Sequence, residues 1–175
     1  MTWRWRLLPL AVFGLFGGVF VRGLLNPSST EIPSQWVGHP MPQFNLPAAA
    51  SSRPGLAFTN LADGHPKIIN IFASWCIPCA AEAPMLEQLR QRGVEVDGIA
   101  LRDRPTDVDA FLVRNGNPYS RIGSDVKSDV AIALGSTGVP ETYVIDGQGV
   151  IRKQHIGAIN PQDIDDLIAT LKAWQ

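Results

Sequence analysis

The chain has 175 residues, about the length of one domain, which excludes a large multidomain enzyme. Its 15 Lys and Arg residues nearly balance its 16 Asp and Glu residues, and 45% of its residues are hydrophobic, which argues against a basic nucleic-acid binder and a disordered polar chain. Arg4, Arg6 and Arg22 lie in or beside an apolar N-terminal run, so the remainder carries 12 positive and 16 negative charges, a net charge of −4.

The N-terminal segment predicts a membrane anchor over residues 1–25. Residues 7–21 contain no charged side chain and follow Arg4 and Arg6. By the positive-inside rule this arginine pair stays cytoplasmic and the rest of the chain is exported, although Arg22 on the far side fits the rule less well.

A cleaved signal peptide is the alternative to an anchor, because 15 apolar residues at about 1.5 Å each are short for a bilayer core of about 30 Å. We favour an uncleaved anchor because the residues that follow show no A-x-A-like cleavage site. A buried core helix fits less well with the arginine pair and the Pro- and Ser-rich sequence that follows. Residues 26–36 are then predicted to be a linker, and residues 37–175 a folded domain.

The folded domain begins with a strand or hairpin within residues 40–66, after which strand and helix patterns alternate. Residues 67–73 are a short, nearly continuous apolar run, as in a strand buried on both faces. The pattern then predicts a helix at 76–92 with Pro84 inside it, a strand at 94–101, and helices at 106–115 and 125–134.

The C-terminal part predicts a β-hairpin and a final helix. Strands at 142–146 and 150–155 flank a Gly-Gln-Gly turn, and the last helix starts at Asn160 as its cap, with Pro161 in the first turn. Strands separated by helices and followed by a hairpin and a helix indicate an α/β fold with a mixed central sheet flanked by helices.

Cys76 and Cys79 are the only cysteines of the chain and form a Cys-x-x-Cys pair at the strand-to-helix junction. A helix N-terminus favours a thiolate, so Cys76 is the predicted nucleophile and Cys79 the resolving thiol of a redox-active disulfide. A purely structural disulfide is the alternative. A structural role accounts less well for this pair, because a disulfide that closes so small a loop removes little entropy from the unfolded chain and so adds little stability.

Two other functions of a Cys-x-x-Cys pair have less support in the sequence. Covalent haem attachment requires a His after the second cysteine, and residue 80 is Ala80. A metal site would need two more ligands, and His39, His65 and His155 are distant in sequence and not paired in spacing. No metal and no cofactor is therefore expected.

Two segments resemble the active site of the thioredoxin superfamily. Residues 70–79 read Asn-Ile-Phe-Ala-Ser-Trp-Cys-Ile-Pro-Cys and are followed by Pro84, and residues 138–142 read Gly-Val-Pro-Glu-Thr, similar to the cis-proline loop of that superfamily. The resemblance implies a thioredoxin-like fold and a cis Val139–Pro140 bond. It also implies substrate-binding roles for Trp75, Val139 and Pro140.

The residues around these motifs resemble the DsbE/CcmG family of cytochrome c maturation proteins. Where thioredoxin carries a buried Asp, this chain has Asn70, which cannot take a proton, so another acid is needed. Glu82 lies one helical turn after Cys79, and Glu141 follows Pro140. Both are candidate catalytic residues, with a raised pKa if they are buried.

The DsbE/CcmG resemblance implies a membrane-anchored thiol-disulfide oxidoreductase on the periplasmic side of a bacterial inner membrane. Its expected electron acceptor is the haem-site cysteines of apocytochrome c, reached directly or through a CcmH-like partner, and its expected donor is a DsbD/CcdA-type membrane thiol carrier. The alternatives are a general extracytoplasmic disulfide reductase of the TlpA/ResA type, a copper-binding redox module, and an anchored interaction domain whose disulfide stays closed.

Overall fold

The computed structural model describes residues 13–14, 16–18, 22 and 35–174. The chain divides into two units, residues 1–33 and 34–175. Within the described part of the chain, no helix is long and apolar enough to cross a membrane. Most of the predicted anchor and linker lies outside the described residues, so both stay predictions.

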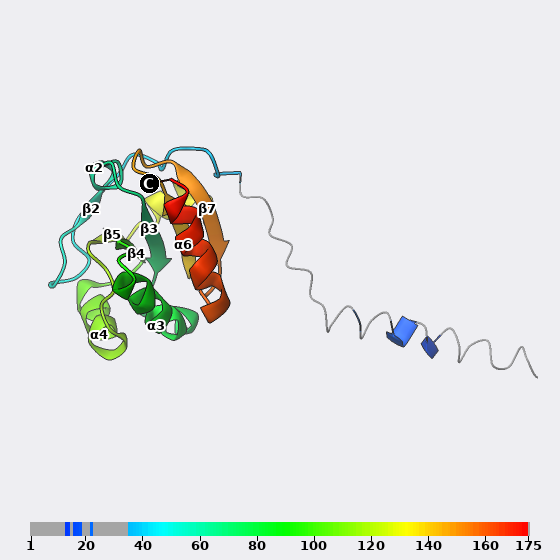
Figure 1. The fold of residues 1–175 in the computed structure, drawn as a ribbon. Helices are drawn as coiled ribbons and strands as arrows, with labels where there is room; N and C mark the ends of the chain where they lie inside the picture. Colours follow the sequence, from blue (N-terminus) through cyan, green and yellow to red (C-terminus); the bar gives the residue numbers. More distant parts are fainter. Residues whose placement is uncertain (1–12, 15, 19–21, 23–34, 175) are drawn as a thin grey trace, which may run out of the picture. The chain divides into compact units, whose positions relative to one another are not determined.

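The second unit is built on a five-stranded mixed sheet with the strand order β5-β4-β3-β6-β7 (Figure 1). β3 and β4 are parallel, as are β4 and β5, whereas β6 runs antiparallel to both β3 and β7. The strands are β3 (Lys67–Phe72), β4 (Val96–Leu101), β5 (Ile122–Asp125), β6 (Glu141–Ile145) and β7 (Ile151–Ile156). All six residues of the central strand β3 are buried, which explains its nearly continuous apolar sequence.

Helices cover both faces of the sheet, so the unit has three layers. On one face, α3 (Ile77–Gln91), α4 (Pro105–Asn115) and α6 (Ile164–Lys172) pack on the sheet through one apolar cluster that also contains both cysteines. On the other face, α2 (Phe58–Leu61) and α5 (Asp129–Ala133) pack on the sheet through a second cluster. A short 3₁₀ turn, Pro161–Asp163, leads into α6. The thioredoxin-like α/β architecture predicted from the sequence is confirmed.

A small hairpin lies against the edge strand β5. Its strands β1 (Asn45–Leu46) and β2 (Leu56–Ala57) are antiparallel, which confirms the predicted N-terminal hairpin. The backbone N–H groups of Ile122 and Ser124 donate to the carbonyl oxygens of Pro54 and Pro47, at 2.9 and 2.8 Å. The outer edge of the sheet is therefore hydrogen-bonded to the hairpin loop instead of being left open.

The predicted elements are found with small shifts at their ends, except around β5. The pattern predicted a helix over 125–134, whereas Ile122–Asp125 is the edge strand and the helix covers only Asp129–Ala133. Asp125 ends the strand, and its Oδ2 accepts a hydrogen bond from the N–H of Ala131 at 3.0 Å. This carboxylate caps a helix that starts after it, which explains why the helical signal included residue 125.

Candidate active site

The dithiol lies at the N-terminus of α3, directly after the central strand. Cys76 is the N-cap residue in an extended conformation, and its Sγ accepts a hydrogen bond from the backbone N–H of Cys79 at 3.1 Å. The two cysteines form a disulfide and expose only 5% and 2% of their surfaces. When the bond is reduced, this N–H and the positive end of the helix dipole favour a thiolate at Cys76.

The proline loop reaches the same end of the sheet. The Val139–Pro140 peptide bond is cis, as the resemblance implied, and Glu141 directly after it pairs with Ile71 near the end of β3. Pro140 is buried, and Val139 is half-buried against the cluster that contains the cysteines.

Two large apolar side chains next to the dithiol face solvent. Trp75 exposes 60% of its surface and Ile77 exposes 83%. Because large apolar side chains in a folded monomer are mostly buried, their exposure beside a reactive disulfide suits contact with another protein chain.

Glu82 is buried in the same layer as the dithiol. It exposes 1% of its surface and is the third residue after Cys79 along α3, so both lie on one face of the helix. Its Oε1 accepts from Asn70 Nδ2 at 3.0 Å and its Oε2 accepts from the backbone N–H of Ile159 at 2.9 Å. Burial raises the pKa of Glu82 to about 7, and the two hydrogen bonds oppose that rise. Glu82 can therefore both take up and release a proton near neutral pH.

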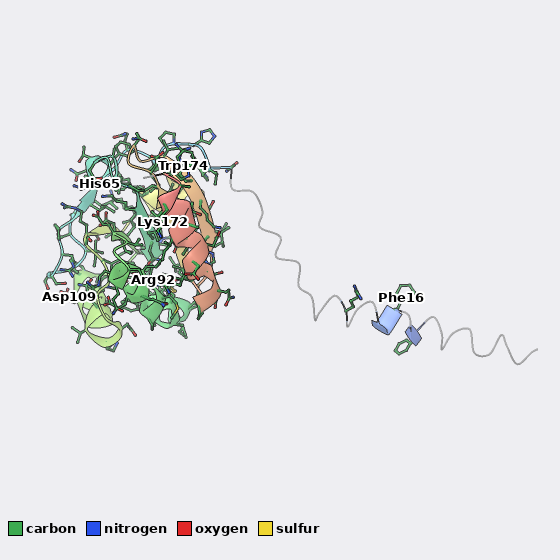
Figure 2. All side chains as sticks on the ribbon, in the orientation of Figure 1. Phe16, His65, Arg92, Asp109, Lys172 and Trp174 are labelled. Atoms are coloured by element: carbon green, nitrogen blue, oxygen red, sulfur yellow. A yellow bond between two sulfur atoms is a disulfide. The ribbon has the colours of Figure 1, made fainter. Side chains whose placement is uncertain are left out.

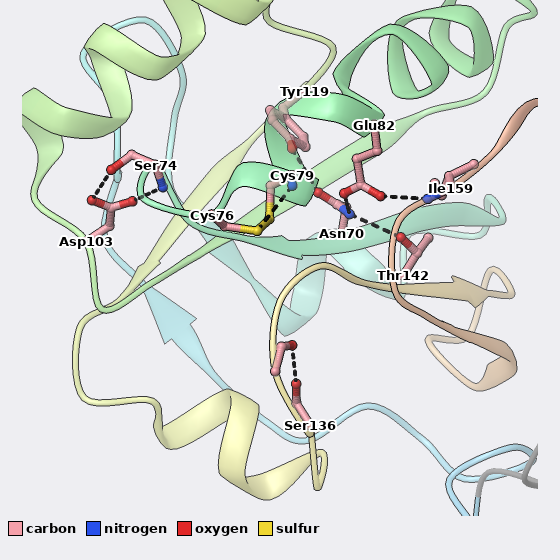
Figure 3. Close-up of a disulfide and its surroundings, with 11 residues drawn as sticks. Asn70, Ser74, Cys76, Cys79, Glu82, Asp103, Tyr119, Ser136, Thr142 and Ile159 are labelled. Atoms are coloured by element: carbon pink, nitrogen blue, oxygen red, sulfur yellow. Dashed lines mark hydrogen bonds between the residues drawn. A yellow bond between two sulfur atoms is a disulfide. The ribbon is translucent and has the colours of Figure 1, made fainter.

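Asn70 is the centre of a buried polar network around Glu82 (Figure 3). Its side-chain nitrogen also donates to Thr142 Oγ1 at 3.1 Å, and its oxygen accepts from the Tyr119 hydroxyl at 2.8 Å. The network joins β3, α3, β6 and the loop before β5.

Glu141 lies on the other face of the sheet. Successive residues of a strand point to opposite faces, and Tyr143, two residues further along β6, belongs to the cluster opposite the cysteines. Glu141 is fully buried and accepts a hydrogen bond from Gln154, while its Oε2 has no hydrogen-bond partner among the described residues. The structure thus joins Glu82, but not Glu141, to the network beside the dithiol, and a catalytic role of Glu141 stays a prediction.

Sequence reasoning did not single out Asp103, which holds the loop before the dithiol. Its Oδ2 accepts from the backbone N–H of Ser74 at 2.5 Å and its Oδ1 accepts from the Ser74 hydroxyl at 2.8 Å. Asp103 follows β4, whose carboxyl end lies beside that of β3 because the two strands are parallel. That position after a buried parallel strand is the signal that could have identified it.

A cleft of about 480 Å³ lies at the opposite end of β3 and β4 from the dithiol. His65, Arg92 and Lys172 line it (Figure 2), and the N-terminal ends of β3 and β4 lie beside it. Within the described part of the chain, no group of three His, Cys, Asp or Glu side chains is arranged to hold a metal ion.

Comparisons with known proteins agree with the geometry of the site. The family model Redoxin matches residues 36–171. The thiol:disulfide interchange protein DsbE of Pseudomonas fluorescens biotype C is 38% identical over 159 residues, which cover 90% of this chain and 87% of the relative. The thiol:disulfide interchange protein HelX of Rhodobacter capsulatus is 34% identical over 166 residues, which cover 95% of this chain and 94% of the relative.

A solved structure has the same fold. The crystal structure of a thiol:disulfide interchange protein DsbE from Chlorobium tepidum superposes with a TM-score of 0.67 at 25% identity, over 78% of this chain and 96% of that one. The Cys-x-x-Cys pair at a helix N-terminus, the cis-proline loop and these relatives together show a thiol-disulfide oxidoreductase. The chain belongs to the DsbE/CcmG family of thiol:disulfide interchange proteins within the thioredoxin superfamily.

Proposed function

We propose that this protein is a membrane-anchored periplasmic reductase of cytochrome c maturation. It reduces the haem-binding cysteines of apocytochrome c, directly or through a CcmH-like partner, and a DsbD/CcdA-type membrane thiol carrier reduces it in turn. The observation that carries the proposal is the dithiol between a helix N-terminus and a cis-proline loop, next to a buried acid that titrates near neutral pH. An oxidising compartment closes Cys-x-x-Cys-His motifs as disulfides, so haem attachment there requires a reductant.

The first step joins the protein to its client. The Cys76 thiolate attacks one sulfur of the client disulfide, a mixed disulfide forms, and the other client sulfur leaves as a thiolate. The exposed side chain of Trp75 and the backbone at Val139 and Pro140 lie where an extended client chain would bind.

The second step releases the reduced client. The Cys79 thiol gives its proton to the Glu82 carboxylate and attacks Cys76 Sγ, and the second client sulfur leaves as a thiolate, which takes a proton in turn. Two electrons have then passed to the client, and Cys76 and Cys79 are joined as in the structure. Because the pKa of Glu82 is about 7, Glu82 accepts the proton more readily as the pH rises through 7.

The test is to trap the client. In Cys79→Ala the second step cannot occur, so the mixed disulfide at Cys76 accumulates in the envelope of a bacterium that makes c-type cytochromes. The adduct is purified under non-reducing conditions and identified by mass spectrometry. The matched control is Cys76→Ala, which keeps the other thiol but lacks the nucleophile and should trap far less protein.

Each outcome of the trap bears on the proposal. Apocytochrome c or a CcmH-like protein in the adduct supports it. A varied set of unrelated envelope proteins would replace it with a general disulfide reductase of the TlpA/ResA type, and the absence of any adduct would refute disulfide reduction altogether. Resistance of the full-length chain to carbonate extraction from membranes tests the predicted anchor, whereas release of the chain would contradict it.

A further inference from the structure

The buried network beside the dithiol includes the hydroxyl of Tyr119, to which the proposed steps assign no role. The Tyr119 hydroxyl donates a 2.8 Å hydrogen bond to Asn70 Oδ1, and Asn70 Nδ2 donates to Glu82 Oε1 at 3.0 Å. Figure 3 shows the three side chains in sequence, with the phenol on one side of the amide and the carboxylate on the other. All three side chains are buried, so water does not compete for these bonds.

The orientation of the Asn70 amide depends on both neighbours. An amide oxygen only accepts and an amide nitrogen only donates, and an ionised carboxylate only accepts. The nitrogen must therefore face Glu82, and the oxygen needs a donor on its other side, which is the Tyr119 phenol. Burial, and after it the charge of Glu82, holds the pKa of Tyr119 well above its ordinary value, so the phenol keeps the proton that it donates.

The fold holds Tyr119 in place for this contact. Its ring stacks on Phe72 with a centroid distance of 4.8 Å and an interplanar angle of 14°, and Arg53 Nε donates to its backbone carbonyl. Gly98 makes room for it, because a Cβ at that position would lie 3.0 Å from the rings of Phe72 and Tyr119. The phenol bonds to Asn70 and not to a sulfur or to Glu82, so any effect on the reaction has to pass through the amide.

We propose that Tyr119 is a positioning residue for proton transfer at the dithiol: through the side-chain amide of Asn70, its phenol orients the hydrogen bond that Asn70 donates to Glu82. This inference rests on the proposed role of Glu82. Without the phenol, the buried Asn70 oxygen loses its donor, and only Glu82 and Thr142 are left to hold the amide with its nitrogen towards the carboxylate. The charged form of Glu82 is then less stabilised, so the pKa of Glu82 rises in Tyr119→Phe.

The test follows the titration of Glu82 directly. The oxidised full-length chain is labelled with ¹³C at glutamate side-chain carboxyls, of which it has five, and the resonance missing from Glu82→Gln is assigned to Glu82. Tyr119→Phe is expected to move its titration midpoint upward by about half a pH unit, and Asn70→Leu by about one to two, because Asn70 donates to the charge itself. Tyr119→Phe should add no further shift in the Asn70→Leu background, because the phenol acts through the amide.

Tyr143→Phe is the matched control, since it removes a buried hydroxyl that bonds to Gln154 on the other face of the sheet, and the Glu82 midpoint should not move. The same variant leaves Tyr119 as the only tyrosine, so growth on 3-fluorotyrosine changes that phenol alone. The fluorinated phenol is a stronger acid and a better donor, and should move the Glu82 midpoint downward. This measurement tests the proposal even where Tyr119→Phe does not fold.

The outcomes separate this inference from the proposed function. An unchanged midpoint in Tyr119→Phe and with 3-fluorotyrosine, or a full additional shift of Tyr119→Phe in Asn70→Leu, overturns the positioning role. The rate at which Cys79 closes a preformed mixed disulfide is measured against pH in the same variants. A midpoint that moves while the rate profile does not follow it would show that the phenol orients the Asn70–Glu82 hydrogen bond, but it would remove Glu82, and with it Tyr119, from proton transfer at the dithiol.

Discussion

Asp97 is a buried carboxyl on the sheet face opposite the dithiol, and replacing it with Asn should stabilise the protein at neutral pH. Its side chain is fully buried in β4, and neither oxygen has a hydrogen-bond partner among the described residues. Lys67 lies nearby, but its ammonium already contacts Asp63 at 2.7 Å, the carbonyl of Asn60 at 2.8 Å and Glu95 at 3.3 Å. The hydrogen bonds of this ammonium therefore go to Asn60 and Asp63, and its ion pairs are with Asp63 and Glu95.

The pKa of Asp97 gives the size of the effect. Burial, and after it the charge of Glu95, raises it from 3.8 to about 7 against the opposing charges of Lys67 and Arg121 and a weaker contribution from the backbone N–H of Arg121. A rise of about three units corresponds to about 4 kcal/mol between the charged and neutral forms. Between these two pH values the folded state holds a proton that the unfolded state has lost, so this contribution lowers stability as the pH rises from about 4 to about 7.

Asp97→Asn removes the charge and keeps the shape, so its advantage over the wild type should be small at pH 4. It should grow by about 1.4 kcal/mol per pH unit up to pH 7 and stay level above it. The assay is urea unfolding of both oxidised proteins at each pH, with the slopes compared to confirm two-state behaviour. Glu82 titrates in both proteins and cancels in the difference.

The control is Asp129→Asn, at an exposed position in the first turn of α5, which should change stability by about 0.5 kcal/mol or less at every pH. An advantage of Asp97→Asn that does not vary between pH 4 and pH 8 would refute the reasoning, because a change in packing alone has no pH dependence. Destabilisation at pH 8 would refute it as well, since it would mean that the buried carboxylate is favourably bound.

Two further substitutions test how the site is held. Asp103→Ala removes both hydrogen bonds to Ser74, so it should lower the free energy of unfolding in urea by about 2–3 kcal/mol. It should also slow the reduction of a model disulfide. An unchanged rate would show that the loop before the dithiol keeps its conformation without Asp103. Gly98→Ala places a Cβ 3.0 Å from two buried aromatic rings and should destabilise the fold by about 1–3 kcal/mol. Thermal unfolding measures this change, and an unchanged stability would show that the rings can move apart.

Local sequence patterns predicted the elements whose own residues favour the conformation and burial that they have in the fold. The six buried residues of β3 and the cap and cysteine pair of α3 are recognisable without knowing the rest of the fold. β5 is different, because Ile-Gly-Ser-Asp has neither apolar alternation nor β-branched enrichment. Its extended conformation comes from pairing with β4 on one side and with the hairpin loop on the other. The hairpin loop precedes β5 by about 70 residues in the sequence.

The same distinction applies to the site. Cys76, Cys79 and Glu82 lie within seven residues of one helix start, so spacing alone placed them on one face. Asp103 contacts a residue 29 positions away and Tyr119 contacts one 49 positions away. No local pattern marks such pairs, because only the parallel sheet and the packing of the loop before β5 bring them together.

Glu82 and Asp97 are buried acids on opposite faces of the sheet, and burial raises the pKa of each to about 7. They differ in the hydrogen bonds that their carboxylate oxygens accept. Neither oxygen of Asp97 has a hydrogen-bond partner among the described residues, so burial outweighs the favourable charges of Lys67 and Arg121 and its ionisation is a net cost to the fold. Glu82 accepts one hydrogen bond on each oxygen, from Asn70 and from Ile159, and these bonds stabilise its charged form. They only partly offset the effect of burial, so its pKa stays near 7. Asn70 cannot carry a proton itself. It donates to Glu82 instead, so in the proposed mechanism the proton acceptor lies on α3, the helix that carries both cysteines, and not on β3.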